Sequence, residues 1–217
     1  MGRFVTFEGG EGVGKSTQMR RLAARLQASG HEVLTTREPG GSPRAEHLRE
    51  VLLSGRAKPF GPMAETVLLA SARADHVDRV IRPALGRGAW VLCDRFIDST
   101  RAYQGALGDI DLGVISALER VAAGDCVPDL TLILDAPVEL GLGRAGARAG
   151  EGAQRDRFEA EGAAFHDRLR RAFIDICRHE PRRCVLVDAT GAEEEVEARV
   201  WDIVTRRFDL TAAMAPA

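Results

Sequence analysis

The chain has 217 residues, of which 45% are hydrophobic and 29% are charged. A length below about 250 residues predicts a single domain, and this balance of apolar and charged residues is typical of a folded globular protein rather than a disordered chain. The formal net charge of −2 argues against a nucleic-acid coat or a polybasic membrane binder, because both carry a large excess of basic residues.

Short apolar segments alternate along the chain with longer segments of helical periodicity. The short segments predict strands at residues 4–7, 32–36, 89–93, 130–134 and 185–187. The longer segments predict helices at residues 16–28, 44–53, 63–85 and 111–123, with two more around residues 158–176 and 196–208. Their apolar stripes place Val67, Leu112 and Val121, among others, on buried helix faces, and Pro83 is expected to bend or end the third helix.

The alternation of strands and helices indicates an α/β fold, in which a five-stranded parallel sheet carries helices on both faces. We expect one domain over residues 1–210 and a frayed tail over residues 211–217. No apolar run approaches the ~18–20 residues that cross a bilayer, and the N-terminal residues do not form a signal peptide. The four cysteines form no C-x-x-C pair. We therefore expect a cytoplasmic protein without a membrane or nucleic-acid partner.

A glycine-rich segment follows the first predicted strand and opens the first predicted helix. It fits the pattern G-x-x-x-x-G-K-[ST] and comprises Gly9, Gly10, Glu11, Gly12, Val13, Gly14, Lys15, Ser16 and Thr17. Glycines let backbone N–H groups surround phosphate oxygens, and the helix N-terminus adds partial positive charge. The Lys15 ammonium can bridge the β- and γ-phosphates of a nucleotide, and the Ser16 hydroxyl can coordinate Mg²⁺. The segment therefore predicts a binding site for a nucleoside triphosphate.

A phosphate-binding loop alone does not separate a kinase from a GTPase or a motor protein. The sequence contains no asparagine, so the Asn-Lys-x-Asp guanine motif is excluded, which argues against a GTPase. Glu11 narrows the choice further, because a carboxylate within a phosphate-binding loop repels phosphate. We expect this side chain to face a different group.

Five further segments, taken together and in this order, resemble bacterial thymidylate kinases. They are residues 36–42 (Thr-Arg-Glu-Pro-Gly-Gly-Ser), 93–96 (Cys-Asp-Arg-Phe), 99–105 (Ser-Thr-Arg-Ala-Tyr-Gln-Gly), 128–132 (Pro-Asp-Leu-Thr-Leu) and 156–159 (Asp-Arg-Phe-Glu). The resemblance covers nearly the whole chain. It implies a P-loop NTPase fold of the nucleoside-monophosphate-kinase type, and transfer of the γ-phosphoryl group of ATP to dTMP with Mg²⁺, in dTTP synthesis. It also implies a homodimer.

The resemblance assigns several residues to the acceptor nucleotide and the metal. Arg95 would hold the dTMP phosphate with its planar guanidinium group, and Asp94, with Ser16, would assist Mg²⁺. Asp94 and Arg95 come at the end of a predicted strand, and ligands of parallel sheets bind beyond the carboxyl ends of the strands. Glu11 would approach the 3′-OH group of dTMP, and Tyr103 would lie against the deoxyribose.

Base recognition is assigned to Arg73, which would face O4 of thymine. Thymine has an acceptor at this position and cytosine has a donor, so an arginine favours thymine. The family often has a phenylalanine under the base four residues earlier. Here that position is Leu69, which keeps apolar contact but not aromatic stacking. Arg37 would reach the acceptor phosphate, and Gln104 belongs to the same substrate-binding set.

A glycine- and arginine-rich segment at about residues 141–157 resembles the lid over ATP. Family members whose loop carries Gly-x-Glu-Gly and no arginine take the arginine that stabilises the transferring phosphoryl group from the lid. The resemblance favours Arg148 for this role and places Arg144 against the adenine. Five glycines would let the lid close. The predicted catalytic set is Lys15, Arg95, Arg148 and Glu11.

Alternatives stay open at this point. Arg73 can be a solvated helix arginine beside Asp75 and Asp78, and Asp94 and Arg95 can form a surface ion pair. The chain can also be a kinase for another small molecule, or a nucleotide-binding switch without catalysis. The switch is disfavoured because the acceptor-side residues form a second site that a switch does not need.

Overall fold

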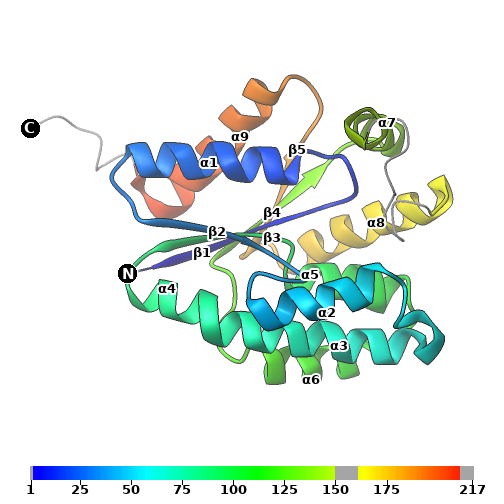
Figure 1. The fold of residues 1–217 in the computed structure, drawn as a ribbon. Coiled ribbons are helices and arrows are strands. Elements are labelled where there is room, and N and C mark those ends of the chain that lie inside the picture. Colours follow the sequence, from blue (N-terminus) through cyan, green and yellow to red (C-terminus); the bar gives the residue numbers. More distant parts are fainter. Residues whose placement is uncertain (1, 150–160, 211–217) are drawn as a thin grey trace, which may run out of the picture.

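The computed structural model describes residues 2–149 and 161–210. Its strands form a five-stranded sheet in the order β2-β3-β1-β4-β5, in which every neighbouring pair is parallel (Figure 1). The strands are β1 (Arg3–Glu8), β2 (Val33–Arg37), β3 (Trp90–Asp94), β4 (Leu130–Asp135) and β5 (Cys184–Asp188). The predicted α/β fold with a five-stranded parallel sheet is confirmed.

Helices cover both faces of the sheet. They are α1 (Lys15–Ala28), α2 (Pro43–Leu53), α3 (Gly61–His76), α4 (Arg82–Gly86), α5 (Ile97–Thr100), α6 (Leu112–Ala122), α7 (Val138–Ala149), α8 (Ala163–His179) and α9 (Glu193–Phe208). Other helical geometry occurs in the 3₁₀ segment η1 (Lys58–Phe60) and the π segments η2 (Val77–Ile81) and η3 (Arg101–Ala106). α1 and α9 lie on one face of the sheet, and α3, α4 and α6 lie on the other (Figure 1). Among the described helices, none is both long enough and apolar enough to span a bilayer.

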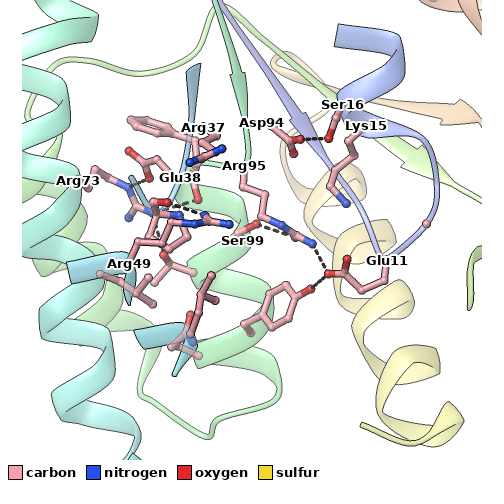
Figure 2. A pocket seen from close by; sticks show the side chains of 18 of the residues that line it. Glu11, Lys15, Ser16, Arg37, Glu38, Arg49, Arg73, Asp94, Arg95 and Ser99 are labelled. Atoms are coloured by element: carbon pink, nitrogen blue, oxygen red, sulfur yellow. Dashed lines mark hydrogen bonds and ion pairs between the residues drawn. The ribbon is translucent and has the colours of Figure 1, made fainter. Parts of the chain in front are cut away.

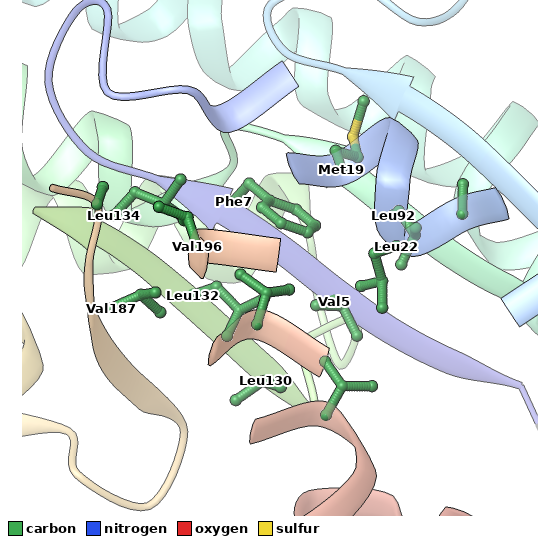
Figure 3. Close-up of a cluster of buried hydrophobic side chains, with 14 of the residues drawn as sticks. Val5, Phe7, Met19, Leu22, Leu92, Leu130, Leu132, Leu134, Val187 and Val196 are labelled. Carbon is green, nitrogen blue, oxygen red and sulfur yellow. The ribbon is translucent and has the colours of Figure 1, made fainter. Parts of the chain in front are cut away.

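A buried apolar cluster fills the space between the sheet and the helices α1 and α9 (Figure 3). Alternate residues of the central strands belong to it, among them Val5 and Phe7 of β1 and Leu132 of β4, and Leu22 and Val196 cover them from the helices. The intervening strand residues belong to clusters on the other face. Because both faces of β1 and β4 are buried, these strands form a rigid base for the loops that leave their carboxyl ends.

The helix predicted at residues 63–85 is present, but it begins earlier and its geometry changes along its length. α3 begins at Gly61, and η2 replaces the α-helical pattern over Val77–Ile81 before α4 begins at Arg82. Pro83 lies in the first turn of α4 and has no N–H to donate to the preceding turn. A π segment just before it accommodates the missing hydrogen bond. Helical structure therefore continues past the proline to Gly86.

The prediction that Val67, Leu112 and Val121 face inward is wrong, since their exposed fractions are 44%, 63% and 83%. Periodicity identifies an apolar stripe on a helix but does not identify the stripe that neighbouring elements cover. The buried residues of α3 are mostly polar and include Arg73. Arg73 forms an ion pair with Glu38 and lies over the ring of Phe96, so the buried face of α3 carries polar groups of the cavity as well as apolar contacts.

The lid segment predicted at residues 141–157 begins as a helix, because residues 141–149 belong to α7. This helix packs directly on the phosphate-binding loop. A Cβ atom on Gly12 would lie only 1.8 Å from the carbonyl oxygen of Gly141, so the two segments can approach this closely only because Gly12 has no side chain. Residues 150–157 of the predicted lid and the predicted tail at residues 211–217 lie outside the described residues.

Leu132→Ala should lower the free energy of unfolding by about 2–5 kcal/mol, because a fully buried leucine leaves a cavity when it is truncated. Leu186→Ala is the control. Leu186 lies on the edge strand β5 and is 42% exposed, so its truncation should lower the free energy of unfolding by only about 0.5 kcal/mol. Urea unfolding followed by circular dichroism measures both. Equal losses would contradict the burial of β4 between β1 and β5.

Candidate active site

The carboxyl ends of the central strands border a cavity of about 350 Å³ (Figure 2). The phosphate-binding loop forms one side of it, and residues of α2, α3, α5 and η3 form much of the rest. All the residues that the resemblance assigns to substrate binding line this cavity: Glu11, Arg37, Leu69, Arg73, Arg95, Tyr103 and Gln104. Lys15, Ser16, Thr17 and Asp94 line it too. One cavity thus joins the loop predicted to bind a triphosphate to the residues predicted to bind the acceptor.

The phosphate-binding loop turns into α1 at Gly14, which adopts the left-handed conformation with φ 95°. The Lys15 side chain lies over the loop. It is 7% exposed, and its ammonium donates to the carbonyl oxygens of Gly9 and Gly10 at 3.1 and 2.6 Å. Burial, followed by the charge of Arg95, lowers the pKa of Lys15. The ammonium is thus held where it can exchange two carbonyl partners for phosphate oxygens.

Ser16 and Asp94 bring a hydroxyl and a carboxylate together beside this loop. The parallel register sets Phe7 of β1 opposite Asp94 of β3, and Ser16 Oγ donates to Asp94 Oδ2 at 2.5 Å (Figure 2). Within residues 2–149 and 161–210, no group of three or more His, Cys, Asp or Glu side chains could hold a metal ion. Mg²⁺ commonly keeps several waters and takes phosphate oxygens as ligands. A hydroxyl and a carboxylate next to a nucleotide site therefore fit this metal.

Glu11 points from the phosphate-binding loop toward Arg95 (Figure 2). Its carboxylate forms an ion pair with Arg95 and accepts a hydrogen bond from Tyr103 Oη at 3.2 Å. Burial raises the pKa of Glu11, but Arg95, Lys15 and Tyr103 outweigh burial and lower the pKa to about 2. The carboxylate is therefore ionised near neutral pH and held by its partners.

Two structural alternatives that the sequence left open are wrong. Asp94 and Arg95 do not form a surface ion pair with each other, because Arg95 pairs with Glu11 and Asp94 accepts from Ser16. Arg73 is not a solvated helix arginine, because it is 4% exposed. Both arginines face the cavity instead.

Arg73 is held by a chain of buried polar side chains. Its Nε donates to Glu38 at 2.7 Å, and the other oxygen of Glu38 lies 3.0 Å from His76 Nδ1. His76 Nε2 in turn lies 2.7 Å from Thr36 Oγ1. Arg73 Nη2 donates to Thr100 and to a backbone carbonyl group. Arg73 Nη1 makes no hydrogen bond within the described part of the chain, which leaves this nitrogen for a ligand.

The other predicted substrate residues lie at different depths of the cavity. Gln104 is 6% exposed and Leu69 is half-buried. Arg37 is more open to solvent and pairs with Glu46 at 3.2 Å. Arg49, on the adjoining α2, also lines the cavity and donates to the carbonyl oxygen of Pro39 at 2.7 Å.

Of the two predicted lid arginines, Arg144 does not line this cavity. Arg144 of α7 donates to the carbonyl oxygens of Ala189 and Gly191 at 3.0 and 3.1 Å, in the connection between β5 and α9. Arg148 also belongs to α7, but its side chain lies outside the described part of the structure.

Sequence reasoning missed Glu8, the last residue of β1. Its carboxylate is fully buried, accepts the N–H of Phe96 at 2.7 Å, and accepts the N–H and the hydroxyl of Ser99 at 3.2 and 2.6 Å. A single acid at the end of a mostly apolar strand was the available signal. Glu38 was missed as well, although it stands inside a segment that carries the resemblance.

Burial, with the charge of Asp98, raises the pKa of Glu8 to about 7 from its usual 4.5. The folded chain thus binds this proton more tightly than the unfolded chain does, so ionised Glu8 lowers the free energy of unfolding. At about 1.36 kcal/mol for each pKa unit, the penalty is on the order of 3 kcal/mol. It is absent below pH 4.5 and complete above pH 7. The contribution of Glu11 to the free energy of unfolding has the opposite sign. Its pKa is lowered, so ionised Glu11 stabilises the fold above pH 4.5, and this stabilisation is lost as the pH falls toward 2.

Comparison with known proteins gives one consistent result. A family model described as thymidylate kinase matches residues 7–200. The thymidylate kinase of Bradyrhizobium sp. (strain BTAi1 / ATCC BAA-1182) is 59% identical over 214 residues, which cover 99% of this chain and 94% of that protein. The thymidylate kinase of Caulobacter vibrioides is 56% identical over 209 residues, which cover 96% and 99%.

A solved structure agrees with these sequence relatives. The crystal structure of thymidylate kinase from Ehrlichia chaffeensis matches this chain with a TM-score of 0.74 at 31% identity, covering 94% of this chain and 98% of that one. The family model spans most of the chain, and the relatives align over nearly their whole length. The chain therefore belongs to the thymidylate kinase family and has its P-loop NTPase fold.

Proposed function

We propose that the chain transfers the γ-phosphoryl group of ATP to dTMP, giving dTDP and ADP in dTTP synthesis. Membership of the thymidylate kinase family supports the reaction. The observation that carries the proposal is the single cavity in which the phosphate-binding loop meets Arg73, Arg95 and Tyr103. Residues 1–210 would act as one domain, with residues 141–157 as its lid.

The reaction needs no general base. The phosphate of dTMP is a monoester with a second pKa near 6, so its attacking oxygen is already ionised at pH 7. Catalysis then depends on alignment, which contributes on the order of 7–11 kcal/mol at best, and on stabilising negative charge. Lys15 would hold the β- and γ-phosphates, while Arg95 and Arg37 would hold the acceptor phosphate. Arg95 lowers the pKa of Lys15, so these cations repel each other, and phosphates between them would relieve the repulsion.

The acceptor side of the cavity suits a thymine deoxynucleotide. Arg73 would offer Nη1 to thymine O4, held in place by its buried partners. Leu69 would supply apolar contact with the base, and Gln104, which also lines the cavity, would belong to the same substrate-binding set. Glu11 would accept a hydrogen bond from the 3′-OH group, and Tyr103 would lie against the deoxyribose.

We also propose Mg²⁺ as the cofactor. Ser16 would hold it through its hydroxyl group, and Asp94 would hold it through water. A bound Mg²⁺ neutralises charge that develops on the β- and γ-phosphates. Oxygen donors of this kind suit a hard cation.

A coupled assay of ADP release with a panel of nucleoside monophosphates tests the reaction. With ATP and Mg²⁺, dTMP should be the preferred acceptor over dCMP, CMP and AMP. Preference for CMP or AMP would support a kinase for another nucleotide, and tight ATP binding without turnover would support a switch.

Arg73→Lys should raise the KM for dTMP by about 10–100-fold. Lysine keeps the charge but lacks the planar guanidinium group, which can hydrogen-bond to Glu38 and to the base at the same time. The KM for ATP should stay the same, and the preference for dTMP over dCMP should fall. Arg79→Lys is the control, since Arg79 pairs with Asp75 in an exposed position. An unchanged KM for dTMP in Arg73→Lys would contradict base recognition by Arg73.

Arg148→Ala should lower kcat by roughly 10²–10³-fold with little change in either KM, because the lost interaction forms only in the transition state. Steady-state kinetics with both substrates measure this split. Arg178→Ala, which removes an exposed arginine of α8, serves as the control. Near-normal kcat in Arg148→Ala would transfer the role to another lid arginine.

We propose a homodimer, supported by exposed apolar side chains on the adjoining helices α3 and α6. Phe60, next to α3, is 77% exposed, Val67 of α3 is 44% exposed, and Leu112 of α6 is 63% exposed. Sedimentation equilibrium should give twice the mass of one chain, and Val67→Glu should shift the protein to monomer. Leu186→Glu on the edge strand β5 should leave the dimer intact. A monomeric parent protein would contradict the proposal.

We propose the cytoplasm as the compartment. All four cysteines are free thiols, and Cys93, Cys126 and Cys184 are buried. Free thiols are typical of proteins in reducing compartments, which supports this location.

A further inference from the structure

A buried carboxylate joins the first strand to the segment that carries Arg95. We propose that Glu8 is a positioning residue that holds Arg95 in place for the acceptor phosphate, acting through Ser99 and the backbone N–H of Phe96. The inference rests on the proposed contact between Arg95 and the phosphate of dTMP. It assigns a role in the reaction to a residue that lies beneath the substrate cavity and does not line it.

The backbone around Arg95 requires such an anchor. Arg95 has φ 70°, a left-handed conformation that is unfavourable for any residue with a Cβ atom. Its N–H donates to the carbonyl oxygen of Phe7 at 2.9 Å, and this bond continues the pairing of β1 with β3. The next N–H, that of Phe96, donates to Glu8 Oε1 at 2.7 Å. Glu8 therefore binds the chain directly after the unfavourable residue and fixes the turn.

The side chain of Arg95 is connected to the same carboxylate. The Ser99 hydroxyl donates to Glu8 Oε2 at 2.6 Å. Arg95 Nη1 donates to Ser99 Oγ at 3.3 Å (Figure 2). An ionised carboxylate accepts hydrogen bonds only, so the hydroxyl hydrogen must point to Glu8 and the lone pairs of Ser99 Oγ stay available to Arg95. One carboxylate thus fixes both the backbone and the guanidinium group.

The fold alone does not require a charge at this position. A glutamine could accept the same two backbone N–H bonds without burying a charge, whereas ionised Glu8 destabilises the chain at neutral pH. The carboxylate adds a negative charge near Arg95 and Lys15. Asp98 of α5 also acts on it and opposes its ionisation. The charge therefore serves the cationic site above it rather than the stability of the sheet.

Glu8→Gln separates these two roles. At pH 8 the variant should have a melting temperature equal to or above that of the parent, and this gain should disappear near pH 4.5, where Glu8 is protonated. The KM for dTMP should rise about tenfold, as expected for loss of a charge-assisted contact, while the KM for ATP changes by less than about twofold. The amide must turn the Ser99 hydroxyl into an acceptor, which removes the fixed direction of this group.

Asp129→Asn is the matched control, because Asp129, just before β4, also accepts a backbone N–H of β1. Asp129 accepts the N–H of Phe4 at 2.8 Å at the opposite end of β1, so its neutralisation changes a backbone contact of β1 far from Arg95. The KM for dTMP should be unchanged in this variant.

A double-mutant cycle with Arg95→Ala tests the route of the effect. If Glu8 acts through Arg95, Glu8→Gln should add little to the KM for dTMP when Arg95 is already alanine. Additive effects would overturn the inference, as would a lower melting temperature at pH 8 with both KM values unchanged. An unchanged KM for dTMP in Arg95→Ala alone would overturn the proposed role of Arg95 and the inference with it, which distinguishes the two failures.

Discussion

The parallel pairing of β1 with β3 is the constraint on which the site depends. Adjacent parallel strands end at the same edge of the sheet, so the loop after β1 and the segment after β3 leave side by side. Phe7 stands opposite Asp94 in this pairing, and Ser16 and Asp94 meet although they are 78 positions apart in the sequence. Backbone hydrogen bonds between the two strands thus bring the phosphate-binding loop next to the segment that carries Asp94 and Arg95.

The site concentrates positive charge, and its two buried arginines are compensated by separate carboxylates. Arg73 pairs with Glu38, which also contacts His76, so this arginine is held entirely by protein groups on its own side of the cavity. Arg95 pairs with Glu11 across the gap between β3 and the phosphate-binding loop. Buried charges without partners are strongly unfavourable. The first pair therefore keeps one wall rigid, and the second joins the two walls to each other.

The sequence was sufficient to predict the structural features that depend on short stretches of chain. Strand alternation located all five strands to within a residue or two, and the phosphate-binding motif located the start of α1, because both depend on short stretches of chain. The sequence did not predict features that depend on which elements pack against one another in the fold. Leu112 and Val121 are exposed although Ile115 of the same helix is buried, so neighbouring elements cover only part of the apolar stripe of α6. The hydrogen bond between Glu8 and Ser99 spans 91 positions, and no local pattern indicates it.

Glu8 and Glu11 are three positions apart in the sequence, but their pKa values shift in opposite directions. The charged groups next to each carboxylate decide the direction of the shift. Glu11 is largely buried, but its carboxylate touches the Arg95 guanidinium group, so its pKa falls to about 2. Glu8 is fully buried and lies near Asp98, so its pKa rises to about 7, although the hydrogen bonds that it accepts from Phe96 and Ser99 oppose this rise. At Glu11, stability and the binding site benefit from the same ion pair. At Glu8 the two requirements conflict, since the charge that orients Arg95 is the one that weakens the fold.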